Sequence, residues 1–184
     1  MSFNIQVEEG NIDEVADLFA AMGSKVIDQA RVAATNKVMS ETRKGIKKDI
    51  REETRVPAKQ INKRMKLFRA KRNKDARLFV GTMPVKLVTV AKRSRTATTA
   101  RSAKGRYSPN KAFTATMKSG HIGIFKRQGK ARLKIDEQFV SIVDAARRSV
   151  RKHARVIIPK TFPKLFEKEL SIRTTREVVK RQLN

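Results

Sequence analysis

The sequence predicts an α+β protein, with an antiparallel sheet packed against a long N-terminal helix and C-terminal helices. Apolar residues recur at helical spacing near the N-terminus, alternate in the middle of the chain, and recur at helical spacing again near the C-terminus. The 184 residues, 39% of them apolar, suit one domain with a core. We expect a single domain over 1–184, made of a helical part at 1–66, a β part at 67–135 and a C-terminal helical part at 136–184.

Two helices are expected before residue 54. The first, 11–22, has Asn11 as a capping residue and ends at Gly23. The second, 25–53, carries an alanine-rich apolar stripe that is interrupted at Thr42. The stripe consists of Ile27, Ala30, Ala34, Val38, Ile46 and Ile50.

A short third helix is predicted over 57–66, because Pro57 suits a helix start and Ile61 and Met65 share one side. The spacing then changes to alternation. Residues 77–90, "RLFVGTMPVKLVTV", predict two strands that are broken around Gly81–Pro84.

Residues 92–111 lack a core-forming pattern and predict a long mobile basic loop or a protruding hairpin. Strand patterns return in 112–117, "AFTATM", and in 121–125, "HIGIF", with a turn at Ser119–Gly120. The β part is therefore expected to contain one basic loop or hairpin, over 92–111, that protrudes from its sheet.

Helical spacing returns after Ile135, in an apolar stripe of Phe139, Ile142, Val143, Ala146 and Val150. Pro159 and Pro163 bracket a break or a helix start. A last, more polar helix is expected over 172–183.

The charge is concentrated in the middle of the chain. Of the net +27, residues 54–135 contribute +23, with 24 basic residues and the single acid Asp75. Residues 76–135 hold fifteen basic residues and no acid. An ordinary solvated surface mixes both signs, so this span predicts an anionic partner, with nucleic acid as the first candidate. No apolar run approaches the length of a membrane helix, and no helix combines a strong apolar face with a polar face of lysine and arginine alone, so no membrane partner is expected.

An enzyme is not expected. His121 and His153 lie far apart without a metal or triad motif, and each is more typical of a surface residue. The chain has no phosphate-binding glycine loop, and without cysteine it has no thiolate metal site. We therefore predict no catalytic or metal-binding residues, no cofactor and no small-molecule substrate. The absence of cysteine fits folding in a reducing cytoplasm.

The basic residues of the β part are the candidate contacts to phosphates, which need charge rather than exact geometry. The alternative is a solvated, flexible face. Sequence-specific reading is not expected, because zinc-finger spacing, a basic zipper and an aromatic RNA-recognition strand pair are all missing. The predicted nucleic-acid-facing residues are Lys92, Arg93, Arg95, Arg101, Lys104, Arg106, Lys126, Arg127, Lys130 and Arg132.

Residues 125–135, "FKRQGKARLKI", resemble a hairpin of the phage minor tail protein Z and tail-completion family. That hairpin follows the pattern aromatic-x-Arg-x-Gly-x-x-Arg-x-Pro-Ile. Its matched positions are Phe125, Arg127, Gly129, Arg132 and Ile135. Lys134 departs from the pattern, standing where the family often has proline. Gly129 is predicted to make a structural turn. The order of the other parts is similar from about Asp28 onward.

The resemblance implies a structural virion protein at the head-proximal end of a phage tail, assembled in the host cytoplasm. Such a protein helps complete the tail and join it to the head. The implied partners are further copies in a ring, usually six-fold, the tail terminator, the head completion or connector proteins, and phage DNA contacted through phosphates.

Two alternatives stay open. One is a cytoplasmic, non-sequence-specific nucleic-acid-binding protein associated with ribosomes or the nucleoid. The other is a neck protein whose basic surface meets acidic protein neighbours instead of DNA.

Overall fold

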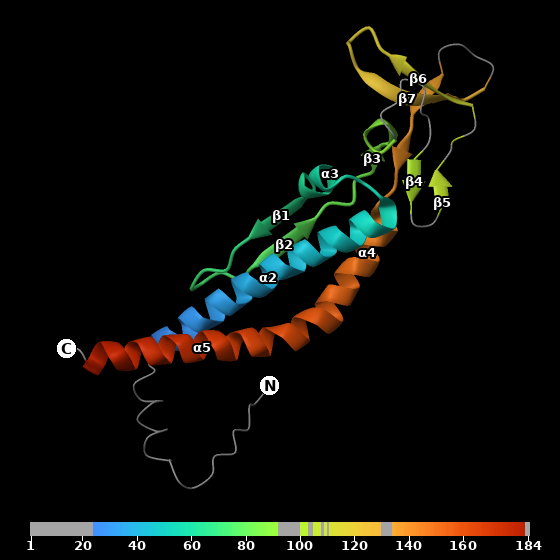
Figure 1. Cartoon of the computed structure of the whole chain (residues 1–184). Helices are drawn as coiled ribbons and strands as arrows, with labels where there is room; N and C mark the ends of the chain where they lie inside the picture. The colour runs from blue at the N-terminus through green and yellow to red at the C-terminus, as the bar shows by residue number, and fades with distance from the viewer. Residues whose placement is uncertain are drawn as a thin grey trace. The chain divides into compact units, whose positions relative to one another are not determined.

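A computed structural model gives the architecture of most of the chain (Figure 1). It describes residues 24–91, 100–102, 105–107, 109, 111–129 and 134–182. Its elements are long helices and short antiparallel strands, which confirms the predicted α+β class. The helix predicted over 11–22 lies outside the described residues.

The residues group into two compact units. Among the described residues, the first unit contains 24–38, 69–76 and 160–182. The second unit is formed from residues 39–68 and 77–159. The single domain over 1–184, with boundaries after residues 66 and 135, stays a prediction.

Helix α2, Ser24–Thr54, confirms the helix predicted over 25–53 and supplies residues to both units. Most of its predicted apolar stripe is buried, and the polar Thr42 within the stripe is buried too. Ile27, near the start of the helix, is an exception with 40% exposure. The buried stripe residues are Ala30, Ala34, Val38, Ile46 and Ile50.

The prediction of a helix over 57–66 was wrong at its end. Helix α3 covers only Ala58–Asn62, and strand β1 begins at Met65. Strand β1, Met65–Phe68, pairs antiparallel with strand β2, Arg77–Val80. Ile61 and Met65 are both buried, so the prediction that they share the core side is consistent with the structure. Met65 nevertheless lies in a strand, because pairing with β2 outweighs the helical spacing of these two residues.

The two strands predicted in 77–90 are present, but they do not pair with each other. Strand β2 ends at Val80, and β3, Val85–Lys86, pairs with β9, Phe139–Val140. A 3-10 turn, η1 at Leu87–Thr89, follows β3 and buries Leu87. The break at Gly81–Pro84 therefore separates two different sheets.

A three-stranded antiparallel sheet has the order β6-β7-β8. Its strands are β6 at Ala112–Thr116, β7 at Ile122–Arg127 and β8 at Ile135–Glu137. The predicted turn between β6 and β7 is present, with the Gly120 amide donating to the Met117 carbonyl at 2.9 Å.

The C-terminal helical part begins later than predicted. Residues 135–140 form β8 and β9, so Phe139 belongs to a strand and not to a helical stripe. Helix α4 covers Val143–Lys152. A π-helical turn, η2, covers His153–Ile157, and α5 then runs over Ile158–Gln182 with Pro163 inside it. Pro159 thus lies at a helix start, and Pro163 does not end the helix.

The main hydrophobic core belongs to the second unit. It joins the second half of α2 to α3, β1, β3, η1, β7, β9 and α4. Its fully buried larger side chains are Ile46, Ile50, Val56, Ile61, Val85, Leu87, Ile124 and Ile142. Within the described helices, none combines the length and apolar character needed to cross a membrane.

Candidate nucleic-acid interface

Gly129 lies two residues after strand β7, in the connection that leads to β8. Arg127 on β7 is in register with Ile135 on β8, and the Gln128 amide donates to the Lys134 carbonyl at 2.9 Å. Gly129 has φ +145°, a conformation that L side chains rarely adopt. The structure thus places a glycine-dependent bend directly after β7.

Replacing Gly129 with alanine is expected to lower the free energy of unfolding by about 1–3 kcal/mol. A Cβ there would meet no atom of the described residues within 4 Å, so the cost expected is backbone strain and not a clash. Urea unfolding of the full chain measures it. Gly120→Asn is the control, because φ +77° at Gly120 is one that asparagine tolerates. If Gly129→Ala and Gly120→Asn have the same free energy of unfolding, the positive φ at Gly129 does not strain an alanine.

Aromatic packing supports the base of this turn. Phe125 is 5% exposed, and its ring centroid lies 6.3 Å from that of Phe113 on β6. The Arg127 guanidinium carbon lies 5.6 Å from the Phe113 ring centroid, within range of a cation–π contact. The apolar side of β7 is thus anchored, while Lys126 and Arg127 are exposed at its end.

The local charge at this turn is less one-sided than the sequence suggests. Lys126 is in register with Asp136 on β8. The Gln128 side chain also donates a hydrogen bond to the Asp136 carboxylate. Asp136 lies just beyond the acid-free span 76–135 in the sequence, and strand pairing therefore places it beside basic residues of that span.

A second basic hairpin lies within 92–111, as one of the two alternatives predicted. Strand β4, Ala100–Ser102, pairs with β5, Gly105–Tyr107, and the register makes Arg101 and Arg106 partners. Lys126 and Arg127 belong to the other sheet, β6-β7-β8. The remaining predicted phosphate contacts, Lys92, Arg93, Arg95, Lys104, Lys130 and Arg132, lie outside the described residues.

The two histidines lie in different surroundings. His121 is partly exposed, and its Nε2 lies 2.9 Å from Glu137 Oε1, while Lys86 Nζ lies 3.2 Å from Glu137 Oε2. His153 was expected at the surface, but the structure buries it to 5% exposure against Gly45 of α2. In the part of the chain that the structure describes, no three His, Cys, Asp or Glu side chains gather to hold a metal.

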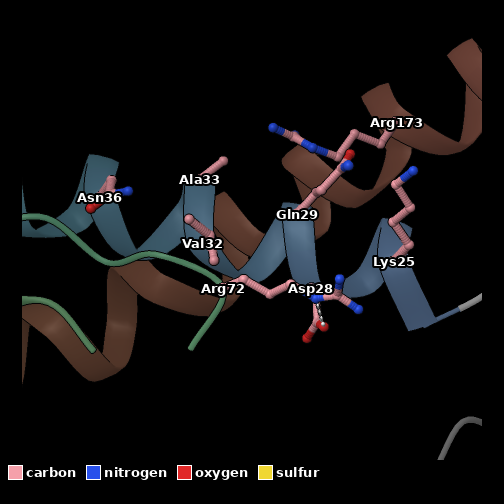
Figure 2. A pocket seen from close by; sticks show the side chains of 8 residues that line it. All are labelled: Lys25, Asp28, Gln29, Val32, Ala33, Asn36, Arg72 and Arg173. Carbon is pink, nitrogen blue, oxygen red and sulfur yellow. Dashed lines mark ion pairs between the residues drawn. The ribbon is translucent and has the colours of Figure 1, made fainter. Parts of the chain in front are cut away.

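A groove of about 530 Å³ in the first unit is lined by α2, Arg72 and Arg173 of α5 (Figure 2). Asp28 forms ion pairs with Arg31 and Arg72, at 3.7 Å each. Arg173 is held by the Glu169 carboxylate. The carboxylates of Asp28 and Glu169 are therefore paired with arginines around this groove, and its basic side chains outnumber its acids.

A second basic surface was missed by the sequence analysis. The end of α2 and the loop after it line a groove of about 820 Å³, and four of its side chains are basic. They are Lys47, Lys48, Arg51 and Arg55. Residues 1–53 are acidic overall, which hid Lys47, Lys48 and Arg51 from a count of charge along the chain. The i, i+4, i+8 spacing of Lys47, Arg51 and Arg55 was the available signal.

Comparison with known proteins gives a family. The model of the family described as prophage minor tail protein Z matches residues 12–181, beginning earlier than the resemblance expected from Asp28. No curated protein and no solved structure matches the chain. Because the match covers most of the chain, this protein belongs to the prophage minor tail protein Z family of structural phage tail proteins.

Proposed function

We propose that this tail protein acts at the head-proximal end of the tail, where it helps complete the tail and join it to the head. It carries out no catalysis. Copies assemble into a ring, six-fold in the usual form, between the tail terminator and the head completion or connector proteins. Its basic surface faces the DNA that passes through or ends there.

The observation that carries this proposal is the acid-free span 76–135, which holds fifteen basic residues. A surface of one sign is unfavourable unless an anion lies near. Like-charged partners such as Arg101 and Arg106 also disfavour a hairpin on its own. Phosphates passing a ring supply the missing negative charge without any sequence-specific contact.

Reversing Arg93, Arg95, Arg101 and Arg106 to glutamate is expected to leave folding intact and to lower the yield of infectious particles by at least roughly tenfold, since the phosphates would meet repulsion. Plaque titre of phage that carry the variant gene measures this. Circular dichroism of the purified chain checks folding.

The control reverses four exposed cations of α5, Lys160, Lys164, Lys168 and Lys180, which changes the net charge equally. Its titre should exceed that of the first variant. Unchanged infectivity of the first variant would overturn the DNA-facing role. Co-purification of the native protein with ribosomes instead of phage particles would favour the cytoplasmic alternative.

A further inference from the structure

We propose that the groove at the end of helix α2 is a second site for the phosphate backbone of duplex DNA, separate from the two basic hairpins. The inference extends the proposed DNA-facing role to residues in the helical part of the chain. The α2-end groove is lined by Lys47, Lys48, Arg51, Arg55, Glu52 and the apolar residues 56–58.

Lys47 and Arg51 lie four residues apart on α2, so their side chains are about 6 Å apart along the helix axis. Arg55 follows directly after the end of the helix at Thr54, where its backbone has φ +58°. Among the ion pairs of the described residues, the groove contributes only Lys48 with Glu52, at 3.9 Å between two exposed groups. Lys47, Arg51 and Arg55 are left to an external anion.

Two of the three acids at this helix end, Asp49 and Glu53, pair with residues of α4. Glu53 holds Arg148, and Asp49 accepts a hydrogen bond from the Ser149 hydroxyl at 2.8 Å. Asp49 Oδ2 also lies 3.7 Å from Lys152 Nζ. Packing against α4 therefore takes up these two acids and leaves Lys47 and Arg51 on another face of the helix.

The backbone fixes Arg55 in an unfavourable conformation. Arg55 has φ +58°, in the left-handed region that usually takes glycine after a helix. It is held between Thr54 and Val56, which are 7% and 0% exposed, while the Thr54 hydroxyl donates to the Ile50 carbonyl at 2.6 Å. An arginine at this position places a positive charge in the groove, although its left-handed backbone conformation destabilises the folded state.

The helix dipole offers a simpler explanation for part of this pattern. Cations within the last turn of a helix are stabilised by its negative end, which accounts for Arg51 and Arg55. Lys47 and Lys48 lie further back, where this effect has faded. The helix dipole does not explain basic residues that lie before the last turn of α2, and these therefore point to an external partner.

The lining of the groove favours duplex DNA over other nucleic acids. Val56, Pro57 and Ala58 supply apolar surface, and none of the eight residues that line it is aromatic. Single-stranded nucleic acid is usually held by bases stacked on aromatic rings, whereas duplex phosphates require only placed cations. An acidic protein surface is the rival occupant.

The test measures binding of a short fluorescent DNA duplex to the full chain by anisotropy, as a function of salt concentration. The groove variant is Lys47→Gln, Arg51→Gln and Arg55→Gln. Three lost phosphate contacts should reduce the slope of log affinity against log salt by about 2–3. The matched control, Lys160→Gln, Lys164→Gln and Lys168→Gln, should keep the slope of the unmodified chain.

A hairpin variant, Arg95→Gln, Arg101→Gln and Arg106→Gln, separates this inference from the proposed function. If only the groove variant loses slope, the groove binds DNA and the hairpin surface does not. If the groove variant behaves like the α5 control, the inference is overturned.

The single substitution Arg55→Gly distinguishes binding from a structural role. Glycine relieves the positive φ, so this variant should unfold at a higher urea concentration while its affinity for the duplex falls. A fall in both stability and affinity would show that Arg55 supports the fold and would count against the inference.

Discussion

Replacing Gly45 with alanine is expected to lower the free energy of unfolding by at least about 2 kcal/mol. In an ordinary helix the same change stabilises by about 1 kcal/mol. Here an alanine Cβ would lie 2.3 Å from Cε1 of His153 and 2.9 Å from its Nε2. The imidazole is buried at the start of the π-helical turn, so it has little room to move away. Urea unfolding measures the loss.

The same substitution should change sign when the imidazole is removed. In a His153→Ala background the clash is gone, and Gly45→Ala should then stabilise by about 1 kcal/mol. Lys44→Ala, at the exposed neighbouring position, is the control and should have little effect. If Gly45→Ala stabilises the unmodified chain, then His153 of η2 does not lie close against Gly45 of α2, and the expected clash is contradicted.

Replacing Glu169 with glutamine is expected to cost about 1–2 kcal/mol of stability at neutral pH. Glu169 is 4% exposed, and its carboxylate accepts hydrogen bonds from Lys37 on α2 and Arg173 on α5. Removal of its charge leaves two cations without their anion. Lys37 is about half exposed and can be solvated, which keeps the expected loss moderate.

The effect should depend on pH in a defined direction. Hydrogen bonds from Lys37 and then Arg173 hold the pKa of Glu169 below its ordinary value of 4.5, against the opposing effect of burial. A lowered pKa in the folded state gives stability that is present above 4.5 and is lost as the pH falls through the folded value. The difference between Glu169→Gln and the unmodified chain should therefore shrink in acid.

Thermal unfolding at neutral pH and at successively lower pH values tests this dependence. Glu167→Gln, at an exposed position on the same helix, is the control. A difference between Glu169→Gln and the unmodified chain that stays constant below pH 4.5 would show that the carboxylate is not held by these cations.

Long periodic segments were predictable from the sequence, and short strands were not. Helix α2 was expected within one residue at each end, because its apolar stripe continues for many turns. The first two residues of β1 and the whole of β9 were assigned to helices. Each strand has two to four residues, too few for alternation to show. Each is defined by its partner, which is the next strand β2 for β1 and the sequence-distant β3 for β9.

The candidate interface could be predicted only where its basic residues lie within one stretch of sequence that contains no acids. Arg101, Arg106, Lys126 and Arg127 stand in a span without acids, so composition identified them. The α2-end groove escaped because basic and acidic residues are mixed in 47–55. Contact with α4 pairs Asp49 and Glu53, while Lys47, Arg51 and Arg55 line the groove together with Glu52.

The sequence by itself determined the α+β class, the long helix α2, the basic middle of the chain and the resemblance to the minor tail protein Z family. These depend on local periodicity, composition and motif, which need no knowledge of distant contacts. Only the tertiary structure decided that Gly45 makes room for His153, that Asp136 lies beside the basic turn, and that Asp49 and Glu53 of α2 pair with α4. Each of these depends on which distant residues come together, and many pairings are compatible with the same local pattern.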